Sequence, residues 1–304
     1  MSEKQPRSVA FNVLKGGMGK TMVSKNTACE LAREDSVLLI DLDDNGHLSR
    51  HLGFEEEFFD GYHIGEAMTE RIDVELEDLV HDTGFGFDFI PATHRIEQLE
   101  GFFRGCASEV EVLRNQIVEP WLGSRYDYIL FDTPANRSLA TKNAVVAARN
   151  LVVPVVSGVQ GDDGISSTIK RIHKPLNERL DAGVRILGLI PNKINQRLDQ
   201  QTNDRKLLEN INTRDGITRW VPNFARIPDE IWTEIDNGAL SSTPKPGIRY
   251  DGDLDKEAPL RYVNDESQQL EYFEEIANIV RYGGVSRNDD IADEIRKEHG
   301  GSSA

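Results

Sequence analysis

A glycine-rich stretch near the start of the chain constrains its fold more than any other feature. The stretch reads Lys15, Gly16, Gly17, Met18, Gly19, Lys20 and Thr21. It follows a short apolar run at residues 9–14 and precedes a helix-compatible segment at residues 22–33. A strand, a glycine-rich turn and a helix in this order are typical of a phosphate-binding loop, because glycine lets backbone N–H groups approach an anion and the helix N-terminus adds further donors. We interpret the stretch as an ATP site.

The loop departs from the usual phosphate-binding pattern at its first position. That pattern has a glycine five residues before Gly19, where this chain has Leu14, and a second lysine, Lys15, precedes the paired glycines. Lys20 can reach the β- and γ-phosphates of a nucleotide, and the hydroxyl of Thr21 can bind Mg²⁺. The alternative interpretation is a glycine turn with two exposed lysines.

Length and charge limit the class of protein. A chain of 304 residues is long enough for one large α/β domain with a sizeable core. No apolar run approaches the ~18 residues of a membrane span, and Cys29 and Cys106 give neither a disulfide framework nor a metal-ligand cluster. A net charge of -17 argues against a membrane surface or a broad nucleic-acid face as the dominant partner. We expect a cytoplasmic protein whose acidic surface is typical of a cytoplasm with a high salt concentration. The alternative is an acidic protein from a cell with an ordinary salt concentration.

A second apolar run, at residues 37–40, ends in two carboxylates, Asp41 and Asp43. A continuous apolar run is expected of a parallel strand that is covered on both faces. Alternation along a strand puts Asp41 and Asp43 on the same side. The carboxyl end of a parallel strand is where open α/β sheets bind ligands. A solvated loop is the alternative for this pair.

A third acidic position follows the apolar run at residues 126–131. This run ends in Asp132, the Walker-B arrangement, in which a carboxylate holds Mg²⁺ directly or through water. Further patterns predict strands at 85–92, 151–156 and 184–190 and helices at 96–121, 141–149 and 268–280. The order of these elements predicts an α/β fold: a single-domain P-loop NTPase with a twisted, mostly parallel β-sheet flanked by helices on both faces. We place the domain at residues 1–282, and a polar, acidic and flexible tail at 283–304.

Taken together, these motifs resemble those of the deviant Walker-A ATPases, the ParA/MinD superfamily. The resemblance covers roughly residues 8 to 280. Residues 126–134 read Tyr-Asp-Tyr-Ile-Leu-Phe-Asp-Thr-Pro, close to the family's Tyr-Asp-Tyr-Ile-Leu-Ile-Asp-Cys-Pro. The family's second motif is typically Asp-Leu-Asp-Pro-Gln-Gly, and here Asp44 and Asn45 replace its Pro-Gln pair.

The resemblance implies a role for each charged residue of the motifs. Lys15 would cross a dimer interface to the partner's nucleotide, which makes it catalytic together with Lys20 and Asp43. Asp43 would orient the water that attacks the γ-phosphate. Thr21, Asp41 and Asp132 would serve the Mg²⁺ ion. ATP and Mg²⁺ are the implied cofactors.

The resemblance also implies the nucleotide contacts. These are assigned to Gly16, Gly17, Met18, Gly19, Lys20, Thr21 and Met22 of the loop, to Asn192 at the adenine edge and to Pro222 near the base. Family members often carry a second threonine where this chain has Met22, so one hydroxyl contact is lost, at roughly 1–3 kcal/mol. We expect nucleotide binding to survive this change. For Asn192 the alternative is a turn residue after Pro191.

Within this family the chain looks most like the short ParA/Soj proteins, which segregate DNA or position cargo. It begins almost at the loop, so we expect no N-terminal helix-turn-helix. Residues 291–304 are acidic and lack an aromatic face, so we expect no direct membrane binding. Arg197 and Arg226 match the family's DNA-binding arginines by local pattern; the alternative is two ordinary surface arginines. Non-specific DNA binding also weakens as salt rises.

The resemblance predicts an ATP-dependent dimerising ATPase whose hydrolysis step releases the dimer from DNA. Its partners would be a second copy of the chain, a ParB-like or adaptor protein, and non-specific DNA. Its location would be cytoplasmic, on the nucleoid if it binds DNA. The alternative is a MinD-like positioning or regulatory ATPase that docks a protein partner without DNA.

Overall fold

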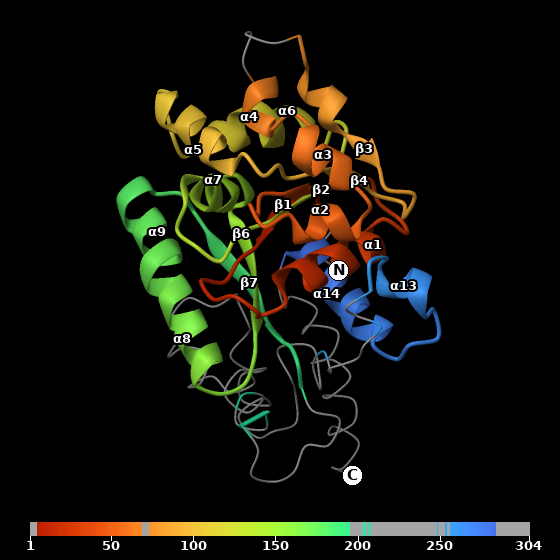
Figure 1. Cartoon of the computed structure of the whole chain (residues 1–304). Coiled ribbons are helices and arrows are strands. Elements are labelled where there is room, and N and C mark those ends of the chain that lie inside the picture. Colours follow the sequence, from red (N-terminus) through yellow and green to blue (C-terminus); the bar gives the residue numbers. More distant parts are fainter. Residues whose placement is uncertain are drawn as a thin grey trace, which may run out of the picture.

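A single twisted sheet forms the centre of the computed structural model, which describes residues 5–68, 73–194, 203–204, 207, 248, 253 and 256–283 (Figure 1). Within these residues seven strands lie in the order β3-β4-β2-β5-β1-β6-β7. All neighbours are parallel except the edge strand β3, which pairs antiparallel with β4. The strands are β1 (Arg7–Phe11), β2 (Val37–Asp41), β3 (His81–Asp82), β4 (Asp88–Ile90), β5 (Tyr128–Asp132), β6 (Asn150–Val155) and β7 (Arg185–Pro191).

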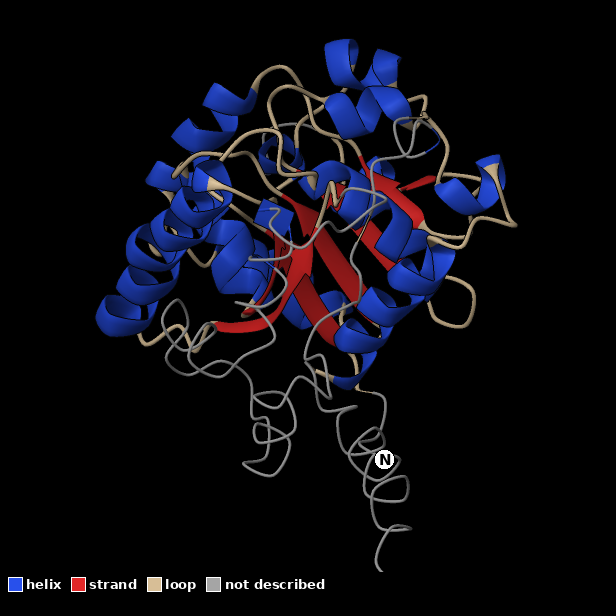
Figure 2. Cartoon of the chain, turned by 90° about the horizontal axis from the view of Figure 1, so that it is seen from below, coloured by secondary structure: helices blue, strands red, loops and turns tan. Residues whose placement is uncertain are grey.

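Helices cover both faces of this sheet (Figure 2). One face packs against α1 (Lys20–Leu31), α2 (His47–His51), α13 (Leu260–Val263) and α14 (Leu270–Tyr282). The other face packs against α5 (Ile96–Gly105), the π-helical turn η2 (Arg114–Val118), α7 (Leu139–Ala148), α8 (Val159–Thr168), the π-helical turn η3 (Ile169–His173) and α9 (Lys174–Leu180). The shorter elements are α3 (Glu55–Asp60), α4 (Ile64–Ala67), the 3₁₀ turn η1 (Leu76–Leu79) and α6 (Glu119–Trp121).

The strands carry apolar side chains on both sides because both faces are covered. In β5, Ile129 and Phe131 belong to the core on the α7 side, whereas Tyr128 and Leu130 belong to the core on the α1 side. All four are fully or almost fully buried. The predicted fold class is therefore confirmed.

The helices differ from the sequence analysis in two regions. The continuous helix expected at 96–121 is wrong: α5 ends at Gly105, the next residue is extended, and helical structure resumes at Val112, just before η2 and α6. The continuous helical segment α8-η3-α9 was not predicted, since Gly161, Gly164 and Pro175 weaken its helical pattern. Gly161 is required there, because a Cβ at this position would lie 1.7 Å from the carbonyl oxygen of Val156.

Helices α13 and α14 make ion pairs and hydrogen bonds with α1, the helix that follows the phosphate loop, and with the residues next to it. Arg261 of α13 makes two bonds of 2.7 Å to the buried carboxylate of Glu30 in α1. Arg281 of α14 pairs with Asp35 at 2.8 Å and also donates to the carbonyl oxygens of Glu30 and Leu31, at the end of α1. The buried Lys25 donates to two carbonyl oxygens just before α13, at 2.6 and 3.0 Å. The last described elements thus hold α1 in place.

The predicted domain boundary lies next to the end of α14. This helix stops at Tyr282, and Gly283 follows in the left-handed conformation, with φ of 79°. The rest of the predicted tail, 284–304, lies outside the described residues, so the domain limits stay a prediction. Among the described helices, none combines the length and the apolar character needed to cross a membrane.

Candidate nucleotide site

The phosphate loop connects β1 to α1 at the carboxyl edge of the sheet, and glycine fixes its shape. Gly17 and Gly19 have φ values of +75° and +92°, which L side chains rarely adopt. A Cβ at Gly19 would lie 2.1 Å from Nδ2 of Asn192. Any larger residue at Gly19 would therefore both strain the loop and displace Asn192.

The N-terminus of α1 is open toward the loop. Gly19 caps this helix without a side-chain hydrogen bond, and its first turn contains no acidic residue. The first N–H groups of a helix have no partner inside the helix and carry partial positive charge. Lys20 is buried and Thr21 half-buried in this first turn. The sequence therefore builds an anion site with a buried cation and a hydroxyl beside it.

Asn192 lies against the loop rather than apart from it. It follows β7, is buried, and its Nδ2 donates to the carbonyl oxygen of Met18 at 2.8 Å. Its Oδ1 accepts from the backbone N–H of Lys193 at 2.8 Å. The structure thus gives Asn192 a role in holding the loop, and its predicted contact with adenine stays a prediction.

A threonine that the sequence did not single out holds the other end of the loop. The backbone N–H of Leu14 donates to Oγ1 of Thr168, at 2.9 Å, and this hydroxyl donates to the carbonyl oxygen of Gly164 at 2.7 Å. Gly164 also lies close to Lys15, because a Cβ at Gly164 would be in van der Waals contact with the Lys15 Cβ, at 3.4 Å. The base of the half-buried Lys15 side chain therefore packs against α8.

The Asp132 carboxylate makes no hydrogen bond in the described part of the chain, although Lys20 and Thr21 lie near it. Asp132 ends β5, is fully buried, and neither of its oxygens meets a hydrogen-bond partner among the described residues. Burial raises the pKa of Asp132, while the nearby Lys20 ammonium and the Thr21 hydroxyl lower it. A buried carboxylate without partners is costly unless a cation binds it. This arrangement fits a divalent cation held between Thr21 and Asp132.

Asp41 is the register partner of Asp132 on the neighbouring strand β2. Its two oxygens are already engaged: Oδ1 accepts from the N–H of Asp43 at 3.0 Å, and Oδ2 accepts from the N–H and Oγ of Ser49, at 3.1 and 2.7 Å. Burial and the neighbouring Asp132 carboxylate raise the pKa of Asp41. Asp41 therefore shapes the turn that follows β2, an arrangement that fits its predicted supporting role behind a metal ion.

Asp43 occupies this turn, two residues beyond the end of β2. Its Oδ1 accepts from the N–H and Nδ2 of Asn45, at 3.0 and 2.7 Å, so that Asn45 orients the carboxylate. The charge of Asp43 contributes to the raised pKa of both Asp41 and Asp132. The three carboxylates that the sequence singled out therefore lie together.

One buried polar residue of the site was missed in the sequence. Asn12 lies within the apolar run before the loop, and its Nδ2 donates to Oγ1 of Thr133 at 2.9 Å. Its Oδ1 is buried and has no hydrogen-bond partner among the described residues. An amide within an apolar run was the available signal. The remaining predicted residues Pro222, Arg197 and Arg226 lie outside the described residues.

Comparisons with known proteins show the family of this chain. A family model described as an AAA domain matches residues 6–182, more than half of the chain. The chromosome-partitioning ATPase Soj of Thermus thermophilus is 33% identical over 194 residues, which are 62% of this chain and 70% of that protein. The cell division protein PomZ of Myxococcus xanthus is 30% identical over 180 residues, 58% of this chain and 55% of that protein.

Solved structures share the fold. Apo McdA of Cyanothece superposes with a TM-score of 0.62 at 18% identity, covering 88% of this chain and 98% of that chain. Cobyrinic acid a,c-diamide synthase of Mycobacterium smegmatis, solved with ADP and magnesium, has a TM-score of 0.63 at 18% identity and covers 90% and 92%. The phosphate loop, the strand-end carboxylates and the match to Soj agree, and the chain belongs to the ParA-like family of P-loop ATPases.

Proposed function

We propose that the chain is a Mg²⁺-dependent ATPase that dimerises on ATP and acts in DNA segregation or in positioning a cellular cargo. The proposal follows relatives named as chromosome-partitioning, cell-division and ParA proteins. The observation that carries it is the partnerless Asp132 carboxylate beside Lys20 and Thr21, at the open end of α1. The negative Asp132 carboxylate is complementary to Mg²⁺, and the positive Lys20 and the start of α1 are complementary to a triphosphate.

The phosphates would be bound by backbone N–H groups of the loop and of the first turn of α1. Lys20 would contact the β- and γ-phosphates, and the Thr21 hydroxyl and Asp132 would hold Mg²⁺, which neutralises phosphate charge when it is bound. Asp43 would position the water that displaces ADP from the γ-phosphate, giving ADP and phosphate. Catalysis in such sites is mainly positioning and charge neutralisation. The Ser49 bonds to Asp41 support this positioning by fixing the turn that carries Asp43.

Lys15 would complete the site of a second copy. Its side chain is half-buried at the start of the loop, and its Cβ lies close to Gly164 of α8. A cation supplied in trans to a phosphoryl group has a physical precedent in the arginine finger. ATP would then join the two copies, and hydrolysis would release them.

Nucleotide binding and dimerisation test this proposal separately. We expect the purified protein to bind ATP with Mg²⁺ in its native salt, and absence of binding would refute the ATPase assignment. Lys15→Ala should retain ATP binding but stay monomeric in light scattering. If this variant still dimerises with ATP, the role of Lys15 is refuted, whereas the ATPase assignment is not.

The acidic composition favours a second candidate, a regulatory or positioning ATPase that docks a protein partner without DNA. A net charge of -17 opposes a broad DNA-binding face, and counterion release weakens as salt rises. A salt titration of ATP-dependent DNA binding decides between the candidates. Loss of binding in Arg197→Ala and Arg226→Ala would support the DNA-bound form, on the nucleoid in the cytoplasm. Absence of DNA binding at every salt concentration would favour the partner-docking form, with a ParB-like or adaptor protein as the partner class.

A further inference from the structure

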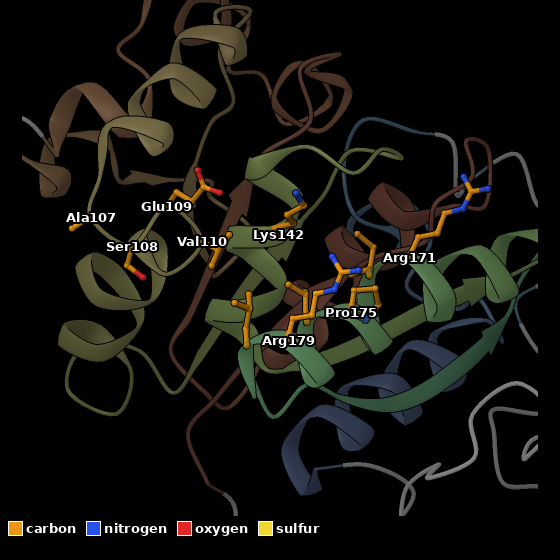
Figure 3. A pocket seen from close by; sticks show the side chains of 11 residues that line it. Ala107, Ser108, Glu109, Val110, Lys142, Arg171, Pro175 and Arg179 are labelled. Carbon is orange, nitrogen blue, oxygen red and sulfur yellow. The ribbon is translucent and has the colours of Figure 1, made fainter.

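A groove on the α7 side of the molecule has no role in the site described above. It lies between the loop after α5, helix α7, and the η3–α9 segment, and its volume is about 400 Å³ (Figure 3). The nucleotide site, in contrast, lies at the carboxyl edge of the sheet around the start of α1. The groove is therefore a separate concave surface.

Positive charge dominates the groove although the chain is acidic. Lys142, Arg171 and Arg179 line it, and Glu109 is the carboxylate among its lining residues. Within the described part of the chain, none of the three cations forms an ion pair or a side-chain hydrogen bond. The whole chain has 35 basic against 52 acidic residues, so a local surplus of cations runs against its composition. Unpaired cations gathered in a concave site raise the local concentration of anions.

The cations come from separate elements. Lys142 belongs to α7, Arg171 to η3 and Arg179 to α9. In Figure 3 the Lys142 and Arg179 side chains appear together in the centre of the view, whereas the Arg171 side chain points away from both. An occupant with two or more negative charges could therefore contact Lys142 and Arg179 together.

Apolar side chains accompany these charges. Leu180 lines the groove and is 52% exposed, which makes it one of the most exposed large apolar residues that the structure describes. Val110, Pro175 and Leu176 line the same groove. A surface that joins exposed apolar area to unpaired cations matches a ligand with both apolar and acidic groups.

We propose that this groove docks an acidic segment of a partner protein that also carries an apolar anchor residue. Charge complementarity and the exposed Leu180 favour such a segment over duplex DNA, which presents phosphates and no apolar side chain at comparable spacing. The groove is also concave, whereas duplex DNA is contacted by basic surfaces that follow its backbone. The proposal does not depend on ATP binding.

A labelled peptide tests the proposal. The probe is a fluorescent amphipathic helix with Glu on one face and Leu on the other, and binding is measured by anisotropy on the full chain. Matched peptides replace Glu by Gln or by Lys. We expect the Glu peptide to bind, more weakly as salt rises, and the Gln and Lys peptides to bind at least tenfold more weakly.

Variants locate the binding surface. The double substitution Lys142→Glu/Arg179→Glu should weaken binding of the Glu peptide at least tenfold, and Leu180→Ser should weaken its binding as well. Lys174→Glu is the matched control, since Lys174 belongs to α9 but does not line the groove; binding should stay within twofold. Circular dichroism and ATP binding verify that each variant is folded.

Three results would overturn the proposal. The first is no binding of the Glu peptide, or equal binding of the Gln peptide. The second is unchanged binding by the Lys142→Glu/Arg179→Glu protein. The third is tighter binding of duplex DNA than of the Glu peptide to the wild-type protein, together with loss of this DNA binding in the Lys142→Glu/Arg179→Glu variant. That result would assign the groove to nucleic acid.

Discussion

The Asp132→Asn variant should separate folding stability from metal binding in this protein. The substitution keeps the side-chain shape and removes the buried charge that lies beside Asp41. Burial raises the pKa of Asp132 from 3.8 to about 7, and each pKa unit corresponds to about 1.4 kcal/mol by which the charged form is disfavoured in the folded protein. The neutral amide removes this cost of roughly 4 kcal/mol but remains a buried polar group without partners, which costs about 1–3 kcal/mol, so the net gain is about 1–3 kcal/mol. For a domain of this size, 1 kcal/mol shifts Tm by about 2 °C. We therefore expect the ligand-free variant to melt about 2–6 °C higher than the wild type.

The same variant should lose the stabilisation that magnesium adds to nucleotide binding. A ligand at a hundred times its Kd stabilises a protein by about 2.7 kcal/mol, so the wild type should gain several degrees with ATP and Mg²⁺. Differential scanning fluorimetry with ATP alone, with ATP and Mg²⁺, and without ligand measures both effects. Asp265→Asn, the same charge change at an exposed position, is the control. A lower Tm for ligand-free Asp132→Asn, or an unchanged shift with magnesium, would refute the reasoning.

Three further predictions follow from groups outside the loop. Arg281→Met should lower the free energy of unfolding by about 3 kcal/mol in a denaturant titration, because the buried Asp35 loses its ion-pair partner; equal stability of variant and wild type would contradict this. Burial raises the pKa of Cys29 to about 12, so a thiol reagent at pH 8 should label Cys106 in the native protein and both cysteines only after unfolding; two native labels would contradict it. Burial lowers the pKa of His173, so protonation favours the unfolded chain as the pH falls below about 6.5. His173→Gln should therefore lose less stability than the wild type between pH 7 and pH 5, and parallel pH profiles would count against this assignment.

The sequence predicted the strands and two strand-end carboxylates, where local chemistry decides the structure. Apolar runs covered on both faces become parallel strands, and two of them, β2 and β5, end in Asp41 and Asp132. Asp41 and Asp132 come together because β2 and β5 are neighbours in the sheet. The register could not be derived from either run alone, but the common carboxyl edge of parallel strands was sufficient to place both carboxylates there.

Contacts between distant segments could not be predicted in the same way. Asn192 and Met18 are separated by 174 positions, and the Asn192 amide reaches the loop only when the sheet is fully assembled. The Ser49 hydroxyl reaches Asp41 because α2 turns back toward the end of β2. Strand β3 is two residues long, which is too short for alternation to reveal it.

The fastening of α1 by α13 and α14 has a consequence for how the protein is made. The phosphate loop is synthesised early in translation. Glu30 and Asp35, in and just after α1, pair with Arg261 and Arg281, which are synthesised much later. A nascent chain that lacks these arginines has the loop sequence without the contacts that secure its helix. Tight nucleotide capture should therefore begin after the segment ending at Tyr282 has left the ribosome. Helix α1 and the α13–α14 segment would then fold as one unit, and the onset of ATP binding would report its completion.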